Sequence, residues 1–310
     1  MTTGVALVTA RGARGLDEDM PPLSAALAAA GAQSSIVEWD DRSVDWARFD
    51  LVVLRSAWDY AERLPEFLAW AEGVARVTTL VNPLPVVRWN TDKHYLGELA
   101  RAGAPVVPTT YLEPGADAAR ALEEFLAREP CRELVVKPAV GAGARDARRH
   151  LSGARAEILG HVAPLLAARR AVMLQPYLAS VDSAGETALM YLNGRFSHAI
   201  RKGALLPAGA PSTAALFAAE HIVPRTPAAD ELAAAERILA AVPVGGRLAY
   251  ARVDLLRDAQ GSPRLLELEL TEPSLFLSYA PESAGRLAAA LMARRTEPWS
   301  SEQRGCPDRT

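Results

Sequence analysis

The stretch YARVDLLRDAQGSPRLLELELTEPSLFL, residues 250–277, predicts the structure around which the chain is organised. Two apolar runs, 251–256 and 265–270, lie on either side of the tract Asp-Ala-Gln-Gly-Ser-Pro at 258–263. Apolar runs joined by a short tract with Gly and Pro are typical of a β-hairpin. We therefore expect two antiparallel strands here.

The second predicted strand alternates leucine with glutamate. Because successive side chains point to opposite faces of a strand, the leucines and the glutamates are expected on different faces. The leucine face consists of Leu266, Leu268 and Leu270, and the other face carries Glu267 and Glu269.

The register of the hairpin brings acidic side chains together. With the turn centred at 260–261, Asp254 pairs with Glu267 and Arg252 pairs with Glu269. Directly opposed side chains are about 5 Å apart at Cβ, and like charges at that distance destabilise a sheet unless a cation joins them. Oxygen ligands without His or Cys favour Mg²⁺ or Mn²⁺. The alternative is a solvated acidic face without a metal.

Length and charge limit the class of protein. A chain of 310 residues with net charge −3 is expected to hold two or three lobes and gives no sign of nucleic-acid binding. Its two cysteines, Cys131 and Cys306, form neither a metal motif nor a disulfide framework. The N-terminus lacks the pattern of a signal peptide, and no apolar run is long enough for a membrane span. We expect a cytoplasmic protein.

The first 85 residues alternate predicted strands with predicted helices, which indicates a small parallel α/β lobe of Rossmann-like type. The strands are expected at 5–9, 35–39 and 51–54, and the helices at 20–30 and 59–74. No Gly-x-Gly-x-x-Gly turn follows the first strand, so a dinucleotide site is not expected.

Arg55 directly follows a predicted strand at its carboxyl end, where open α/β sheets bind ligands. It is a candidate for binding a substrate carboxylate. The alternative is a structural tract in which Asp59 caps a helix and the neighbouring aromatic residues pack.

Two lysines are candidates for phosphate binding. After a linker at 82–85, Asn90 is expected to cap a helix that ends at Gly103 and has Lys93 in its first turn. The helix dipole opposes a cation there, which hints at an anionic partner. Lys137 ends a predicted strand, directly before a glycine loop that suits phosphates. The alternatives are a solvated lysine and an ordinary hairpin loop.

The remaining chain predicts an α+β lobe with antiparallel sheets. Residues 171–178 form an expected strand, and the runs around Asn193-Gly194 form a hairpin. Helices are expected from Thr226 to about Val242 and at 283–294, and the run Arg148, Arg149 and Arg155 is interpreted as a solvated face. The expected divisions are a lobe at 1–85, a linker helix and lid at 86–178, a metal-binding subdomain at 179–295 and a flexible tail at 296–310.

Six segments occur in an order that resembles the ATP-grasp ligases, in particular the glutathione-synthetase-like branch. They are NTDKHYL, VVKPAVGAGAR, LQPYL, GETALMYLNGRFSHAIRKG, RVDLL and LELELTEPSLFL. The resemblance covers about residues 80–290, and the last blocks are most similar to a cyclo-ligase of the D-cycloserine synthetase type, which acts on O-ureido-D-serine. It implies an ATP-grasp fold, in which two α+β subdomains hold ATP between them.

The resemblance assigns roles by position. It implies that Lys93 and Lys137 hold the α- and β-phosphates, and that the loop from Gly141 to Gly143 closes over the γ-phosphate. The backbone of Gln175 and Tyr177 is expected to bind adenine, with Asp182 near the ribose and Glu186 also in the cofactor set. Arg201 and Arg252 are expected to act catalytically on the substrate carboxylate and the transferring phosphate. Asp254, Glu267 and Glu269 are expected to hold two Mg²⁺ ions, although most relatives have Asn at the third position.

Substrate contacts are less well defined by the sequence. Arg55, Lys202 and Ser274 are candidates, and the loop at 203–222 adds Ser212, Thr213 and His221 as polar candidates. His94 and His198 need no catalytic role. The acceptor amine and the oligomeric state stay open, although a homodimer is common in the family.

Three functions remain open from the sequence. The first is an Mg²⁺- and ATP-dependent carboxylate–amine ligase that acts through an acylphosphate on a small amino-acid-like substrate. The second is an intramolecular cyclo-ligase in antibiotic biosynthesis. The third is an ATP-binding protein without catalysis. Phosphorylation turns a poor acyl donor into an electrophile, and the lysines and arginines would neutralise the anions that must meet.

Overall fold

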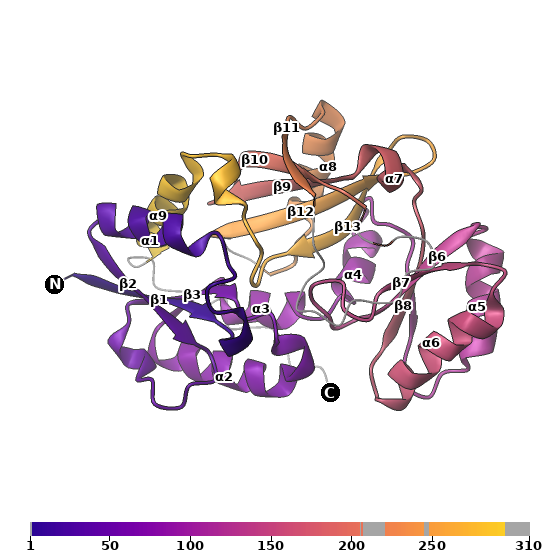
Figure 1. The fold of residues 1–310 in the computed structure, drawn as a ribbon, viewed down its shortest axis with the longest axis horizontal. Coiled ribbons are helices and arrows are strands. Elements are labelled where there is room, and N and C mark those ends of the chain that lie inside the picture. The colour runs from indigo at the N-terminus through magenta and orange to yellow at the C-terminus, as the bar shows by residue number, and fades with distance from the viewer. Residues whose placement is uncertain (1, 205, 207–220, 245–247, 295–310) are drawn as a thin grey trace.

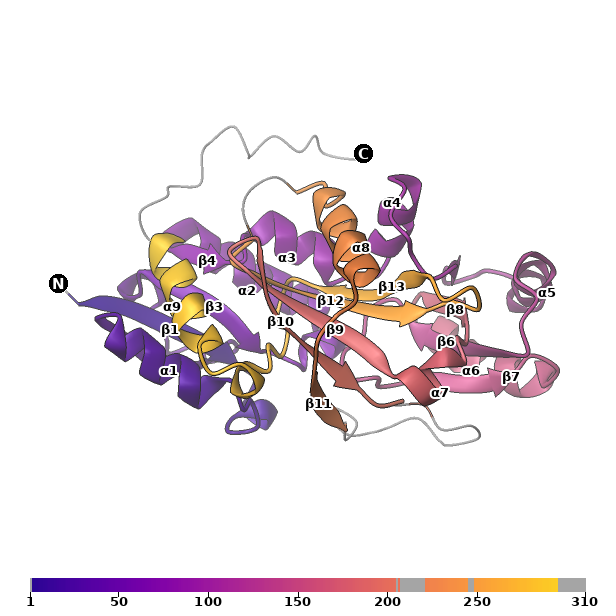
Figure 2. The same cartoon turned by 90° about the horizontal axis from the view of Figure 1, so that it is seen from above.

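The computed structural model describes residues 2–204, 206, 221–244 and 248–294. These residues form three sheets in a row, each with its own helices (Figures 1 and 2). Ser212, Thr213 and the predicted tail at 296–310 lie outside the described residues. No helix within the described ranges is both long and apolar enough to cross a membrane.

The N-terminal sheet is parallel, as the alternation of elements predicts, with strand order β2-β1-β3-β4. Its strands are β1 (Thr3–Thr9), β2 (Ala32–Glu38), β3 (Leu51–Ser56) and β4 (Thr79–Val81). Helices α1 (Met20–Ala29) and α2 (Leu64–Val77) accompany them. The helix expected from residue 59 begins five residues later, because a 3-10 turn occupies Tyr60–Glu62 and Pro65 lies in the first turn of α2.

The linker differs from the prediction. Two short helices, α3 (Leu84–Asn90) and α4 (Tyr95–Arg101), replace the single expected one. Asn90 ends α3 instead of capping a helix, and its side-chain amide bonds the backbone of Leu268 and Leu270 at 2.8 and 2.7 Å. Lys93 therefore lies between two helices, and the prediction that it occupies the first turn of a helix is wrong.

The lid subdomain is an antiparallel sheet in the order β5-β8-β6-β7. Its strands are β5 (Thr110–Leu112), β6 (Glu133–Pro138), β7 (Arg148–Leu151) and β8 (Val172–Pro176). Helices α5 (Ala118–Arg128) and α6 (Arg155–Ala167) cover one face and share a buried core with it. Arg148 and Arg149, interpreted as part of a solvated face, are strand residues of β7.

The central sheet has the order β11-β10-β9-β12-β13 and is antiparallel. Its strands are β9 (Glu186–Leu192), β10 (Arg195–Lys202), β11 (Ile222–Arg225), β12 (Tyr250–Arg257) and β13 (Pro263–Glu269). Its helices are α7 (Ser180–Ala184), α8 (Ala229–Ala240) and α9 (Ser283–Arg294). The helix expected from Thr226 begins at Ala229. Helix α9 packs beside α1 of the N-terminal lobe.

The predicted hairpin register is confirmed at the acidic end. Asp254 pairs with Glu267 and Arg252 with Glu269. A bulge follows, because Leu255 pairs with Leu265 and leaves Leu266 as the extra residue. The leucine face is therefore corrected: Leu265 joins Leu268 and Leu270 in the core, while Leu266 lines a cavity.

Asn82 joins the N-terminal lobe to the central sheet. Its side chain is fully buried and makes three hydrogen bonds, to the backbone of Ala249, Tyr250 and Leu270, at 2.9, 2.9 and 2.7 Å. The lobe that supplies one wall of the cavity is thereby fixed to the strands that carry the acids.

We expect Asn82→Ala to lower the free energy of unfolding by roughly 3 kcal/mol, because it removes three buried hydrogen bonds and leaves their backbone partners unpaired. A urea or thermal melt measures the loss. Thr78→Ala is the control, since it removes a single bond to the carbonyl of Phe49, and is expected to shift the midpoint far less. Equal shifts in both variants would contradict this account of Asn82.

Candidate active site

A cavity of about 420 Å³ lies where the N-terminal lobe, the lid subdomain and the central sheet meet. Most of the residues singled out by the sequence line it. They are Lys93, Lys137, Gly141, Gly143, Gln175, Tyr177, Glu186, Lys202, Arg252, Glu267, Glu269 and Ser274. Asp254 lies behind this wall, 1% exposed, in contact with Arg252 and Lys202.

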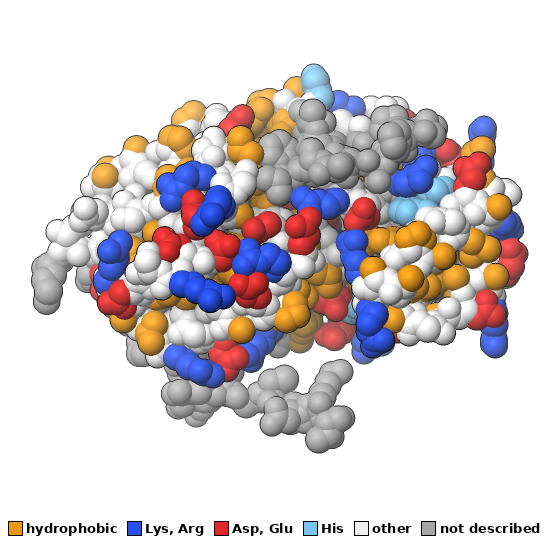
Figure 3. All heavy atoms as spheres, turned by 60° about the horizontal axis from the view of Figure 1, so that its bottom comes forward, with side chains coloured by type: hydrophobic (Ala, Val, Ile, Leu, Met, Phe, Trp, Pro, Cys, Tyr) orange, Lys and Arg blue, Asp and Glu red, His pale blue; other side chains and the backbone are white. Residues whose placement is uncertain are grey.

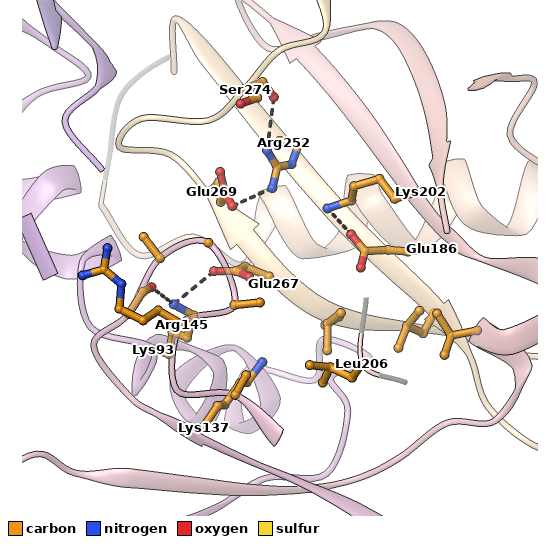
Figure 4. A pocket seen from close by; sticks show the side chains of 18 of the residues that line it. Lys93, Lys137, Arg145, Glu186, Lys202, Leu206, Arg252, Glu267, Glu269 and Ser274 are labelled. Carbon is orange, nitrogen blue, oxygen red and sulfur yellow. Dashed lines mark hydrogen bonds and ion pairs between the residues drawn. The ribbon is translucent and has the colours of Figure 1, made fainter. Parts of the chain in front are cut away.

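Asp254, Glu267 and Glu269 form an acidic row on the hairpin. Figure 4 shows Arg252 beside Glu269 in this row. The Arg252 guanidinium donates to Asp254 Oδ1 at 2.9 Å and contacts Glu269 Oε1 at 2.5 Å. It also donates to the carbonyl of Ser274 at 3.2 Å. Burial would raise the pKa of Asp254, but Arg252 and Lys202 outweigh it and hold the pKa well below its usual range. Asp254 is therefore an anion that orients two cations.

Lys202 is the second cation of this row. Its Nζ contacts Asp254 Oδ2 at 2.8 Å and also pairs with Glu186. Burial raises the pKa of Glu186 to about 7, against the opposing effect of Lys202. Glu186 pairs directly with Lys202 in the β9–β10 register, so both point to the same face of the sheet.

Lys93 and Lys137 enter the cavity from the linker and from β6. Lys93 Nζ lies 3.1 Å from Glu267 Oε1 and donates to the carbonyl of Gly141, so it contacts both the acidic row and the glycine loop. Burial works to lower the pKa of Lys93, but Glu267 outweighs it and the pKa is raised. Burial lowers the pKa of Lys137 to about 8. Figure 4 shows Lys137 pointing into the cavity, and within the described ranges no ion pair holds its Nζ.

The strand β8 ends at the hinge between lid and central sheet. Gln175 is buried and donates from its side chain to Thr109 at 2.8 Å. The Tyr177 N–H already donates to the carbonyl of Glu133, so it is not open to a ligand. Among the described residues no hydrogen bond occupies the N–H of Leu178, which also lines the cavity. Asp182 accepts a hydrogen bond from the Tyr177 hydroxyl.

Two predicted site residues are placed elsewhere. Arg55 is fully buried and pairs with Asp17 and Asp19, at 3.7 and 3.1 Å, so it cannot reach a substrate carboxylate. Arg201 points to the opposite face of β10 from Lys202, because side chains alternate along a strand. Its guanidinium donates to the carbonyls of Ser183 and Ala184, and Arg201 is not among the residues that line the cavity.

The sequence reasoning missed Glu272. It is 7% exposed, lines the cavity, and burial raises its pKa to about 7. Strict alternation would put residue 272 on the leucine face, but β13 ends at Glu269 and a bend turns the chain. A second signal in the sequence is the acidic run Asp17-Glu18-Asp19, directly before the predicted helix at 20–30.

The donor set of the acidic row fits a hard cation. No preassembled group of three acidic, His or Cys ligands occurs in the described part of the chain, since each predicted ligand is paired with a lysine or arginine. Negative charge is nevertheless in excess near Glu269. Burial raises the pKa of Glu269 to about 8, Arg252 opposes this, and Glu267 and Glu272 add to it.

The comparisons with known proteins agree with this architecture. A family model described as the N-terminal domain of D-cycloserine synthetase DcsG matches residues 5–82. The cycloserine biosynthesis protein DcsG of Streptomyces lavendulae is 45% identical over 293 residues, which cover 94% of this chain and 98% of that protein. The crystal structure of D-cycloserine synthetase DcsG has a TM-score of 0.89 at 44% identity, over 94% of this chain and 100% of that one. The ATP-grasp ligase PsnB shares the fold at 19% identity, with a TM-score of 0.64 over 95% and 100% of the two chains.

The three-sheet fold with a charged cavity at its centre is that of an ATP-grasp ligase, an ATP-dependent enzyme that forms carbon–nitrogen bonds. Within that class, the chain belongs to the D-cycloserine synthetase family. The third interpretation of the sequence, a binding protein without catalysis, does not describe this family.

Proposed function

We propose that the chain is an intramolecular cyclo-ligase that closes the ring of a cycloserine-type product from one amino-acid-like substrate. The observation that carries the proposal is that one cavity of about 420 Å³ holds the phosphate-binding lysines, the acidic row and Arg252 together. The similarity to DcsG over nearly the whole length of both proteins supports the ring-closing reaction over an intermolecular one.

The reaction would proceed in two steps. A carboxylate oxygen of the substrate attacks the γ-phosphorus of ATP, the bond to the bridging oxygen breaks, and ADP leaves. A nitrogen of the same molecule then attacks the acyl carbon. The C–N bond forms, the C–O bond to phosphate breaks with its electron pair, and the nitrogen releases a proton.

The charged residues of this chain would each bind a different part of ATP or the substrate. Lys93 and Lys137 neutralise the phosphates of ATP, and Arg252 orients the carboxylate and the transferring phosphate. The Leu178 N–H, to which no described residue is hydrogen-bonded, replaces that of Tyr177 as the expected partner of the adenine edge. The glycine loop, next to Lys93, would exclude water from the acylphosphate.

Mg²⁺ is the cation that the acidic row would hold. Glu267 and Glu269 are the direct ligands we assign, with Glu272 beside them, and two ions remain the expected number from the resemblance. When bound, the metal neutralises phosphate charge and polarises the transferring phosphoryl group.

Phosphate release tests the proposal. Mg·ATP is supplied with O-ureido-D-serine alone, then with added amines, and then with pairs of amino acids. Release with the single compound, together with a cyclic product in the mass spectrum, is the expected result. Release only when two compounds are present would replace the proposal with an intermolecular ligase.

We expect the affinity for Mg·ATP to fall as the pH rises above about 8, because burial lowers the pKa of Lys137 to about 8 and only the protonated lysine attracts phosphate. Above this pH the contribution of Lys137 to the association constant for Mg·ATP falls by about tenfold per pH unit. The fall ends where the pH reaches the pKa of Lys137 in the complex with Mg·ATP. Calorimetric titration in two buffers of different ionisation enthalpy measures the accompanying proton uptake.

Lys137→Met is the matched control for this pH dependence. This variant is expected to bind Mg·ATP weakly at every pH. Its plot of affinity against pH is expected to lack the part of the slope that Lys137 contributes. Identical slopes and proton uptake in the two proteins would show that Lys137 does not titrate in this range.

A further inference from the structure

The N-terminal lobe forms one end of the cavity, and that end is acidic. Leu16, Asp17, Glu18, Asp19 and Trp58 line it. Asp17 and Asp19 follow β1, and Arg55 lies near the carboxyl end of the neighbouring strand β3 and pairs with both. Two carboxylates share one guanidinium, and burial outweighs the effect of Arg55 and raises the pKa of Asp17.

The carboxylate of Asp19 uses its hydrogen-bonding capacity on other residues of the chain. It accepts hydrogen bonds from the backbone N–H groups of Leu275, Phe276 and Leu277, at 2.5, 3.2 and 2.7 Å. It also accepts from Arg55 at 3.1 Å. These contacts hold Phe276 in a left-handed conformation, with φ of 51°. Asp19 therefore shapes the wall of the cavity and has no free acceptor for a ligand.

Asp17 differs from Asp19 in one oxygen. Its Oδ1 accepts from the Asp19 N–H at 3.0 Å, whereas Oδ2 accepts no hydrogen bond from any described residue. The nearest cation to Oδ2 is Arg55 Nε at 3.7 Å, which is an ion-pair distance and too long for a hydrogen bond. The Asp17 side chain is 3% exposed, and a buried carboxylate oxygen without a donor is costly.

This acidic end lies next to the position assigned to the substrate carboxylate. Arg252 donates to the carbonyl of Ser274, and Asp19 binds the next residue, Leu275. One continuous wall thus presents a guanidinium and, beside it, an acidic pocket. An α-amino acid carries its carboxylate and its ammonium in the same neighbouring arrangement.

From these contacts we infer that the pocket around Asp17 is the subsite for the α-ammonium group of the substrate, with Asp17 Oδ2 as its acceptor and Arg55 as a positioning residue. The inference rests on the proposed function and reverses the role predicted for this lobe, which was to bind a carboxylate through Arg55. An ammonium would supply the missing donor. Arg55 holds Asp17 and Asp19 from behind and does not touch the ligand.

The test compares two ligands that differ only in the ammonium group. They are O-ureido-D-serine and its des-amino analogue, 3-(ureidooxy)propanoic acid. Their dissociation constants are measured by calorimetry with Mg²⁺ and a non-hydrolysable ATP analogue, using the wild type, Asp17→Asn and Glu18→Gln. Glu18 is the adjacent, exposed acid at the same end of the cavity, and its change removes the same unit of charge.

The wild type is expected to bind the amino compound roughly 100-fold more tightly than the analogue, because a hydrogen-bonded charge pair in a buried site is lost with the ammonium. Asp17→Asn is expected to reduce this ratio to less than about fivefold without changing the affinity for the analogue. Glu18→Gln is expected to keep most of the ratio. Unchanged affinity for the ATP analogue shows that each variant is folded.

Three outcomes would overturn the inference. They are equal binding of the two ligands by the wild type, an unchanged ratio in Asp17→Asn, and loss of the ratio in Glu18→Gln alone. If Asp17→Asn fails to fold because Arg55 loses a partner, Asp17→Glu serves instead, since it keeps the charge but displaces it by a methylene. It should weaken binding of the amino compound only. Tight binding of O-ureido-D-serine without phosphate release would overturn the proposed function and leave this subsite standing.

Discussion

Glu267→Gln is expected to reduce ATP turnover by roughly 1,000-fold while the fold survives. The change keeps the size of the side chain and removes its charge. That charge pairs with Lys93 at 3.1 Å and belongs to the row assigned to Mg²⁺. Burial would raise the pKa of Glu267, but Lys93 and Lys137 outweigh it and the pKa is lowered, so the native side chain is an anion.

The measurement is phosphate release at increasing Mg²⁺ concentration. If Glu267 is a metal ligand, the variant needs a higher Mg²⁺ concentration for its half-maximal rate, and excess Mg²⁺ restores part of the rate. If Glu267 only orients Lys93, the variant has a lower rate with the same dependence on Mg²⁺ concentration. Glu282→Gln, at an exposed position directly before α9, is the control that removes one carboxylate outside the lining of the cavity. Full activity of Glu267→Gln would exclude the metal assignment.

Gly185→Ala is expected to lower the free energy of unfolding by about 3 kcal/mol and to impair activity as well. Gly185 has φ of 71°, where L side chains are strained. An added Cβ would lie 2.5 Å from the carbonyl oxygen of Lys202 and 2.7 Å from Arg201 Nε. The backbone of β10 would have to move, and Lys202 would move with it, away from Asp254.

Gly160→Ala is the matched control for this substitution. Gly160 lies exposed in α6, nothing approaches its Cβ position within 4 Å, and alanine favours a helix. We expect that variant to be more stable by up to about 1 kcal/mol. Denaturation midpoints and turnover are measured for both variants. A Gly185→Ala protein as stable and active as the wild type would show that the close approach of β10 has no consequence.

The corrected role of Arg201 follows from the same contact. Arg201 and Arg225 both donate to the carbonyl of Ala184, directly before Gly185. Arg201 therefore fixes the α7 turn against β10, and Lys202 is the cation of this strand that lines the cavity. The motif Arg-Lys placed two cations side by side, and strand alternation allowed only one of them to face the cavity.

Local patterns were sufficient for the elements that depend on neighbours in the chain. The pairing of Asp254 with Glu267 followed from alternation and the turn length, and the Asn193-Gly194 hairpin and helix 283–294 followed from turn and helix signals. These features are predictable because period-2 and period-3.6 patterns act over a few residues. The resemblance of six ordered segments then indicated the fold and the enzyme class, which the comparisons confirm.

Only the tertiary structure decided which charged side chains face the cavity and which are buried and paired with other parts of the chain. Arg55 is a candidate carboxylate ligand in the sequence, yet it is fully buried because it pairs with Asp17 and Asp19. Asp19 in turn accepts hydrogen bonds from the distant backbone N–H groups at 275–277. Leu266 and Glu272 reach the cavity because a bulge and a bend interrupt the alternation of β13. Burial, charge pairing and strand irregularity depend on segments up to 258 residues apart, and such contacts leave no local period in the sequence.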